Sequence, residues 1–431
     1  MFPLSRAGRI RELFRSYWTP AGKQALGNLI GLVACTGISQ ACALGVLLVL
    51  TYGLPQEGFG AVIFALNLQS YLVAVGTFGL TAIVVRDLTL HPDKSAETIT
   101  AYLTVVSVAS VLVGVATAVT AAFLPISPDE RVMLWCIAAG NVAACLNLNP
   151  LFDAAHKQAL AAALMVPGDL LAVGMIAGAY LADALSVQTA GVALIGRVAT
   201  TAILHAIVFR RVWPFAWKRN GGRAWRLMRS GWPMLFSGLI YAVPLGGSVV
   251  FVRALSGEIE TSIYGLAFQL VTAELMIVSL ILRVLQPHIS GEYGLTRRFQ
   301  WQLLAVVGGT LLGLIGLMLA AGWVLIFQFL RPEYESVYPV LAVLQGMVVF
   351  FAAAAVANLY LIRFHREGWI QAAHVIAVAV YLALVLGGWS RYHLGYAFAT
   401  TVSSVLLLVV AAFGLRARVA TTSFPDGDVT A

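Results

Sequence analysis

Long apolar runs follow one another along this chain, and they limit what it can fold into. Twelve runs, each close to the ~20 residues of a membrane-spanning helix, lie between residues 27 and 415. The alternating segments of a membrane barrel do not occur. Only 11% of the residues are charged, against about 25% in a soluble domain. This composition excludes a soluble enzyme, a nucleic-acid-binding domain and a disordered chain, and it predicts an all-α polytopic membrane protein.

The basic residues assign an orientation to the predicted spans. Lys and Arg gather in cytoplasmic loops. With the N-terminus in the cytoplasm, 22 of the 27 basic residues fall in cytoplasmic segments, and only Arg131, Arg253, Arg331 and Arg391 fall on the other side. We therefore predict twelve transmembrane helices with both termini cytoplasmic. Arg far outnumbers Lys beside abundant Ala, Gly and Val, as in GC-rich bacterial genomes, so we expect the bacterial inner membrane. The spans are expected at 27–50, 59–85, 98–124, 132–152, 159–182, 190–209, 232–252, 262–285, 302–330, 337–362, 369–388 and 394–415.

The longest and most basic connection divides the spans into two groups of six. Transporters are commonly built from two such bundles. A short internal similarity favours a parallel duplication: Leu54, Glu57 and Gln69, after the first span, match Leu255, Glu258 and Gln269, after the seventh. Residues 4–18 form an amphipathic pattern typical of an interfacial helix. The expected organisation is a cytoplasmic amphipathic segment at 1–26, a six-helix bundle at 27–209, a basic linker at 210–231, a second six-helix bundle at 232–415 and a cytoplasmic tail at 416–431.

The first two spans carry a recognisable series of residues. Gln40 precedes an apolar stretch, the turn Leu54-Pro55-Gln56-Glu57-Gly58-Phe59-Gly60 leads into the second span, and Phe78-Gly79-Leu80 with Arg86 closes it. This series resembles the opening of the oligosaccharide/polysaccharide flippase (O-antigen-unit transporter) family of the MOP superfamily. The likeness covers the whole chain in span number, and at residue level mainly 36–88. Asp169 stands where such proteins often carry a base.

The resemblance implies a MOP/MATE-like fold and a substrate. The substrate is an oligosaccharide joined through pyrophosphate to a polyprenyl lipid, moved by alternating access for surface polysaccharide synthesis, lipopolysaccharide or exopolysaccharide. The implied partners are that lipid-linked oligosaccharide, membrane lipids, a coupling cation (H⁺ or Na⁺), and a polysaccharide polymerase with its co-polymerase. We expect no cofactor, no metal and no nucleic acid.

Charged residues inside the spans are the first candidates for a mechanism, because charge at mid-bilayer costs about 2.5–3.5 kcal/mol. Arg197 lies about 10 Å from the outer end of the sixth span; it suits a pyrophosphate, or it forms a structural ion pair. Asp169 follows Pro167-Gly168, where we expect the helix to bend. It caps freed backbone groups, titrates as a coupling group, or pairs with Arg197. The estimated membrane depths of Asp169 and Arg197 differ by about 9 Å. Glu274, in the eighth span, is a second candidate for the coupling ion.

Other polar residues complete the expected substrate site. Arg253 ends the seventh span at the outer side, and Arg86 either binds substrate or acts as an ordinary positive-inside anchor. The neutral candidates, which either bind sugar hydroxyls or bond neighbouring helices, are Gln40, Asn67, Gln69 and Gln269.

Three functions compete. The first is the flippase. The second is a cation-coupled multidrug or toxin antiporter of the same superfamily, many of which carry an acid in the first span, where this chain has Gln40. The third is an O-antigen polymerase or ligase, which needs a large outer loop that the sequence lacks. No P-loop, metal cluster or catalytic motif is present, so we expect a transporter rather than an enzyme, with no catalytic residue.

Overall fold

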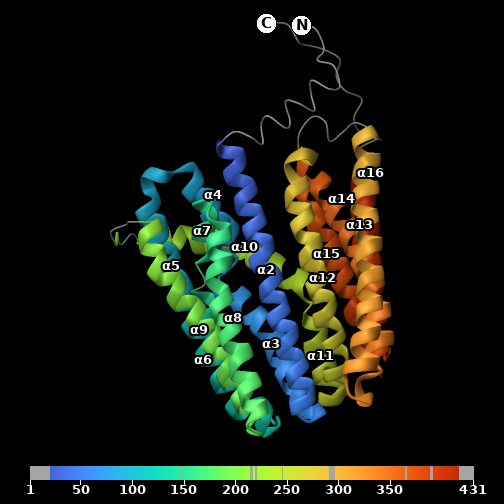
Figure 1. Ribbon diagram of the computed structural model, residues 1–431. Helices are drawn as coiled ribbons and strands as arrows, with labels where there is room; N and C mark the ends of the chain where they lie inside the picture. Colours follow the sequence, from blue (N-terminus) through green and yellow to red (C-terminus); the bar gives the residue numbers. More distant parts are fainter. Residues whose placement is uncertain are drawn as a thin grey trace, which may run out of the picture. The chain divides into compact units, whose positions relative to one another are not determined.

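The protein is helical throughout the part of the chain that the computed structural model describes (Figure 1). The described residues are 20–146, 148–213, 217–218, 221–244, 246–290, 297–364, 366–388 and 392–416, and no strand occurs among them. The predicted amphipathic segment before residue 20 and the tail after residue 416 lie outside this part. The all-α polytopic prediction is confirmed.

Eleven of the described helices are long and apolar enough to cross a membrane. The helices of the N-terminal half are α2 (Pro20–Gly53), α3 (Gln56–Gly76), α4 (Thr81–Leu90), η1 (Pro92–Lys94), α5 (Ser95–Phe123), α6 (Pro128–Cys145), α7 (Asn149–Ala154), α8 (Gln158–Leu181) and α9 (Val187–Val212). Those of the C-terminal half are α10 (Gly221–Ala242), α11 (Gly247–Ser256), α12 (Glu258–Ser290), α13 (Arg297–Val324), η3 (Leu325–Phe329), η4 (Pro332–Tyr334), α14 (Val337–Arg363), α15 (Glu367–Leu386) and α16 (His393–Arg416).

The predicted seventh span is the one without a counterpart among these eleven helices, and it is not a single helix. Its residues divide between α10 and α11, which are separated by Val243–Gly246. Pro244 has no N–H to donate and disfavours helical backbone at the residue before it, which explains the break. α10 also begins eleven residues before the predicted span, inside the segment 210–231 that was expected to be a linker. The count of twelve membrane crossings and the cytoplasmic termini stay predictions.

The Phe78-Gly79-Leu80 motif ends α3 rather than lying inside one span. Phe78 and Gly79 both have positive φ, 54° and 64°, so the chain turns here and restarts as α4. A Cβ at Gly79 would lie 2.7 Å from the backbone N of Leu235 in α10. The Phe78 ring packs against Trp232, with ring centroids 5.6 Å apart. The motif is therefore a turn that docks the first part of α10.

The chain forms two compact units, and two helices belong to both. Unit 1 comprises residues 1–53 and 72–235, and unit 2 comprises residues 54–71 and 236–431. α3 thus begins in unit 2 and ends in unit 1, whereas α10 begins in unit 1 and ends in unit 2. The predicted domain boundaries, at 209 and 232, stay a prediction.

Within unit 1, packing runs in the order α2, α8, α9, α6, α5. An apolar cluster in this unit joins Tyr102 of α5, Phe152 of α7, Phe209 of α9 and Leu227 of α10. α6 and α9 begin with capping boxes, formed by Ser127 with Glu130 and by Ser186 with Thr189. These boxes satisfy backbone N–H groups that a helix start leaves without partners.

Within unit 2, α14 packs on α12 and α16, and α15 packs on α16. The start of α3 is fastened to this unit by Arg331, whose guanidinium donates to the Leu54 carbonyl oxygen over 2.7 Å. Gly60 lies in the family turn, and a Cβ added to it would be 2.2 Å from the carbonyl oxygen of Glu258. Glycine is therefore required at position 60 because α3 touches the start of α12 there.

We expect Gly60→Ala to lower the free energy of unfolding by about 1–3 kcal/mol, the cost of overpacking a closely packed site. The measurement is thermal unfolding of the purified protein in detergent. Gly313→Ala in α13 is the matched control, because nothing lies within 4 Å of a Cβ there; it should be neutral or stabilising. Equal effects of the two substitutions would contradict the close contact.

Candidate functional site

Two charged residues predicted from the sequence meet in unit 1. The Arg197 guanidinium Nη1 lies 3.5 Å from Asp169 Oδ1, and their side chains are 36% and 7% exposed. Asp169 Oδ2 is buried and has no hydrogen-bond partner among the described residues. The pairing that was one of the sequence alternatives is therefore present, and the partly exposed guanidinium keeps donors for another anion.

The observed helix bounds explain why Asp169 and Arg197 pair, although the sequence placed them at different depths in the membrane. α9 begins at Val187 rather than near residue 190, so Arg197 lies about 15 Å into it. Asp169 lies about 18 Å from the end of α8 at Leu181. Both are thus near the middle of their helices. α8 continues through Pro167, and a Cβ at Gly168 would be 2.5 Å from the Arg197 carbonyl oxygen. Glycine at 168 lets α9 approach closely beside Asp169.

The helix α2 completes this polar region of unit 1. α2 packs along α8, and the Cys42 thiol lies within electrostatic range of Asp169. Gln40 is half-buried on the same helix and has a partner within the described residues. We refer to Asp169 and Arg197 as the unit 1 polar site, and a substrate role for Gln40 stays a prediction.

Arg86 lies apart from that site. Its guanidinium bonds Asp87 at 3.2 Å and is 64% exposed. Asp87 also lies 3.8 Å from Arg223 of α10. This surface cluster links α4 to α10, so its geometry supports anchoring, whereas substrate binding by Arg86 stays a prediction.

A buried acid is the main polar feature of unit 2. Glu274 of α12 is 1% exposed, and the amide of Gln345 on α14 lies next to it. Neither carboxylate oxygen of Glu274 has a hydrogen-bond partner of ordinary geometry among the described residues. A buried charge without a partner is costly, so this carboxyl is suited to taking up a proton or a cation.

Two of the remaining predicted residues of unit 2 make local contacts. Asn67 donates to the Ile63 carbonyl of its own helix over 2.8 Å, which fits a structural role. Gln69 and Gln269 are half-buried. Arg253 pairs with Glu258 at 3.1 Å across the α11–α12 turn. These contacts favour a structural role for Asn67 and Arg253, and substrate binding by either stays a prediction.

Sequence reasoning missed a hydrogen-bonded group between α11, α12 and α16. Ser256 bonds the Tyr396 hydroxyl over 2.8 Å, and Tyr264 bonds Thr400 over 3.1 Å. Glu260 accepts from His393, whose Nδ1 lies 2.7 Å away. This group could have been predicted from the sequence, because polar residues spaced three or four apart share one helix face. In α16 these residues are Tyr396, Thr400, Ser403 and Ser404.

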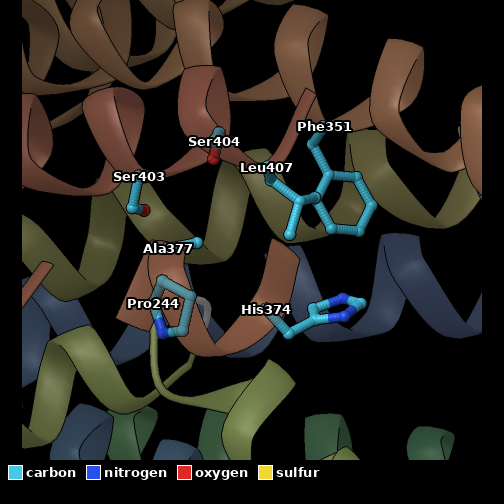
Figure 2. A pocket seen from close by; sticks show the side chains of 7 residues that line it. All are labelled: Pro244, Phe351, His374, Ala377, Ser403, Ser404 and Leu407. Carbon is cyan, nitrogen blue, oxygen red and sulfur yellow. The ribbon is translucent and has the colours of Figure 1, made fainter. Parts of the chain in front are cut away.

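This face continues to a small cavity beside the break between α10 and α11. The cavity is about 10 Å³, room for about one water molecule. Figure 2 shows Pro244 and His374 on one side of it, with Ser403, Ser404 and Leu407 opposite. The His374 Nδ1 lies 2.7 Å from the Ile370 carbonyl oxygen. The chain between α10 and α11, at Pro244, therefore lies next to the polar side chains of His374, Ser403 and Ser404 within unit 2.

Comparison with known proteins assigns the chain to a family. The family described as "Polysaccharide biosynthesis protein" matches residues 25–291. The chain belongs to this polysaccharide biosynthesis protein family. The flippase resemblance stated from Gln40, the 54–60 turn and Arg86 is confirmed. No protein among those with curated descriptions matches the sequence.

Solved structures of similar fold include transporters of the MOP superfamily and a lipid II flippase. "Lipid II flippase MurJ, inward closed conformation" has a TM-score of 0.68 at 13% identity, over 90% of this chain and 87% of that one. An inward-facing multidrug resistance MATE family transporter of the MOP superfamily has a TM-score of 0.62 at 13% identity, over 92% and 100%. A MOP superfamily transporter from Pyrococcus furiosus has a TM-score of 0.58 at 12% identity, over 92% and 96%. At these identities the likeness shows the fold, and this family member is a multi-pass membrane protein with a MATE/MurJ-like fold.

The Asp169–Arg197 pair generates a stability prediction. Asp169→Asn leaves Arg197 without its anion, and Arg197→Gln leaves a buried carboxylate alone, so each should lower the free energy of unfolding. The double variant should lose less than the sum of both, by about 0.5–3 kcal/mol. Thermal unfolding of the four proteins in detergent measures this difference.

The control cycle uses Arg86→Gln and Asp87→Asn. The Arg86 side chain of that pair is 64% exposed, and surface pairs contribute little, so its coupling should be near zero. Similar coupling in the two cycles would contradict a stabilising role for the pair between α8 and α9.

Proposed function

We propose that this protein is a flippase that moves a polyprenyl-pyrophosphate-linked oligosaccharide across the bacterial inner membrane for surface polysaccharide synthesis. The observation that carries the proposal is the family match over residues 25–291 on a fold shared with a lipid II flippase. Translocation proceeds by alternating access, and the protein acts as a transporter, not as an enzyme. A polysaccharide polymerase and its co-polymerase would then use the translocated product.

The unit 1 polar site supports an anionic substrate. A guanidinium donates in a planar fork that suits phosphate oxygens. Arg197 is near the middle of α9 and more than a third exposed, so it can bind a pyrophosphate while Asp169 holds it in position. Gln40, on the neighbouring α2, offers an amide to a sugar hydroxyl.

Two features favour the flippase over its alternatives. The membrane part of α2, Ile30–Gly53, contains no acidic residue, whereas many multidrug antiporters of the superfamily have one there. The connections expected on the outer face are short, for example 124–127 between α5 and α6, and 182–186 between α8 and α9. A polymerase or ligase would need a larger outer loop for its catalytic residues.

Deleting the gene should abolish or strongly reduce surface polysaccharide, and lipid-linked intermediates should accumulate on the cytoplasmic side of the inner membrane. The measurement is polysaccharide on the cell surface together with an assay of intermediates on each side of that membrane. The wild-type gene should restore both, whereas Arg197→Gln, expressed to the same level, should not. Normal polysaccharide with lost drug tolerance would contradict the flippase and support the antiporter.

Glu274 is the proposed coupling residue. If its carboxyl takes up the coupling ion, Glu274→Gln should remove the dependence of transport on the ion gradient, because the amide cannot change its charge. The measurement is translocation in reconstituted vesicles with and without a proton or sodium gradient. Asp183→Asn, an exposed carboxylate in the α8–α9 connection, is the control and should keep the dependence. A Glu274→Gln protein that still responds to the gradient would place coupling elsewhere.

A further inference from the structure

A large apolar groove lies on unit 1, away from the unit 1 polar site. Its volume is about 780 Å³, within the ~300–1,000 Å³ of small-molecule sites. It is formed by α5, α6 and α9, with Leu103, Ala143 and Ala202 among its lining residues. Arg197 and Asp169 do not line it. α9 therefore contributes to a polar site near its middle and to an apolar groove further along.

The depth of the groove corresponds to half a membrane. On α9 its lining runs from Ala199 to Arg210, a rise of about 17 Å, and the hydrocarbon core is about 30 Å thick. On α6 the lining runs from Ala139 to Leu146, at the end of that helix, and on α5 it is Leu103, near the start. All three positions fall in the half that the basic residues assign to the cytoplasm.

One end of the groove has the chemistry of a membrane interface. Arg210, Trp213 and Trp217 line it there. Trp213 is held in place, since its indole N–H donates to the Leu151 carbonyl oxygen over 2.9 Å. Arg210 is exposed, and its side chain makes no hydrogen bond or ion pair within the described residues. A cation and two indoles at the mouth of an apolar groove match a lipid with an anionic headgroup.

We propose that this groove binds an anionic phospholipid of the cytoplasmic leaflet, with an acyl chain between α6 and α9 and its phosphate on Arg210. The groove spans only one half of the membrane, and this distinguishes a resident phospholipid from the transported polyprenyl-linked substrate. A polyprenyl-linked substrate must send its headgroup to the other side, which a headgroup held at Arg210 cannot reach. The groove therefore takes a resident lipid, and this inference does not depend on the transported substrate.

Native mass spectrometry of the full-length protein in detergent, with phosphatidylglycerol or phosphatidylcholine added, tests the proposal. The wild type should retain phosphatidylglycerol in preference to phosphatidylcholine. Arg210→Gln should weaken phosphatidylglycerol binding about fivefold, as expected for one Arg beside an anionic headgroup. Arg211→Gln, the exposed neighbour that does not line the groove, should bind as the wild type does.

A second pair of variants tests the groove itself. Ala206→Phe fills it and should release the bound phosphatidylglycerol, whereas Ala116→Phe, on an exposed part of α5 outside the groove, should not. Equal retention by both Phe variants, or equal loss in Arg210→Gln and Arg211→Gln, would overturn the proposal. Displacement of phosphatidylglycerol by undecaprenyl phosphate that depends on Arg210 would overturn it in favour of the substrate lipid.

Discussion

The absence of water from the bilayer core governs this structure, because every backbone and side-chain polar group there needs a partner within the protein. Continuous helices satisfy the backbone over most of the chain. Where a helix breaks, neighbouring helices cover the break: the turn after α3 packs on α10 through Phe78 and Gly79, and the gap between α10 and α11 lies beside the His374 and Ser403 side chains. The breaks coincide with family motifs and with polar surroundings.

The same constraint distinguishes Asp169 from Glu274, the buried acids near the middle of their helices. Asp169 has a cation, and Gly168 brings α9 close beside it. Glu274 has the Gln345 amide beside it, and no ion pair of Glu274 occurs within the described residues. A paired carboxylate keeps its charge at low cost, whereas an unpaired one in the interior is stable only when a proton or cation neutralises it. Within the proposed mechanism, Asp169 therefore holds the Arg197 side chain in position, and Glu274 takes up the proton or cation.

Helices α3 and α10 are each divided between the two units. The family motifs of α3 therefore make contacts in both units. The first part of α3, including Gly60, packs with α12 in unit 2, and the first part of α10 packs with the Phe78-Gly79 turn in unit 1. The residues that show internal similarity, Leu54 to Gln69 and Leu255 to Gln269, therefore belong to the same unit. Glycine occurs at position 60, where α3 meets α12, because a Cβ there would collide with the Glu258 carbonyl oxygen.

The sequence by itself determined the helical membrane class, the family and most span positions, because apolar length and turn motifs are local properties. It also singled out Arg197, Asp169 and Glu274, since charge in an apolar run is visible without a structure. Only the tertiary structure decided that Arg197 meets Asp169, that Gln345 lies beside Glu274, and that the seventh span is broken at Pro244. Those outcomes depend on where neighbouring helices begin and how closely they approach, and span boundaries estimated from hydropathy are too coarse to give either.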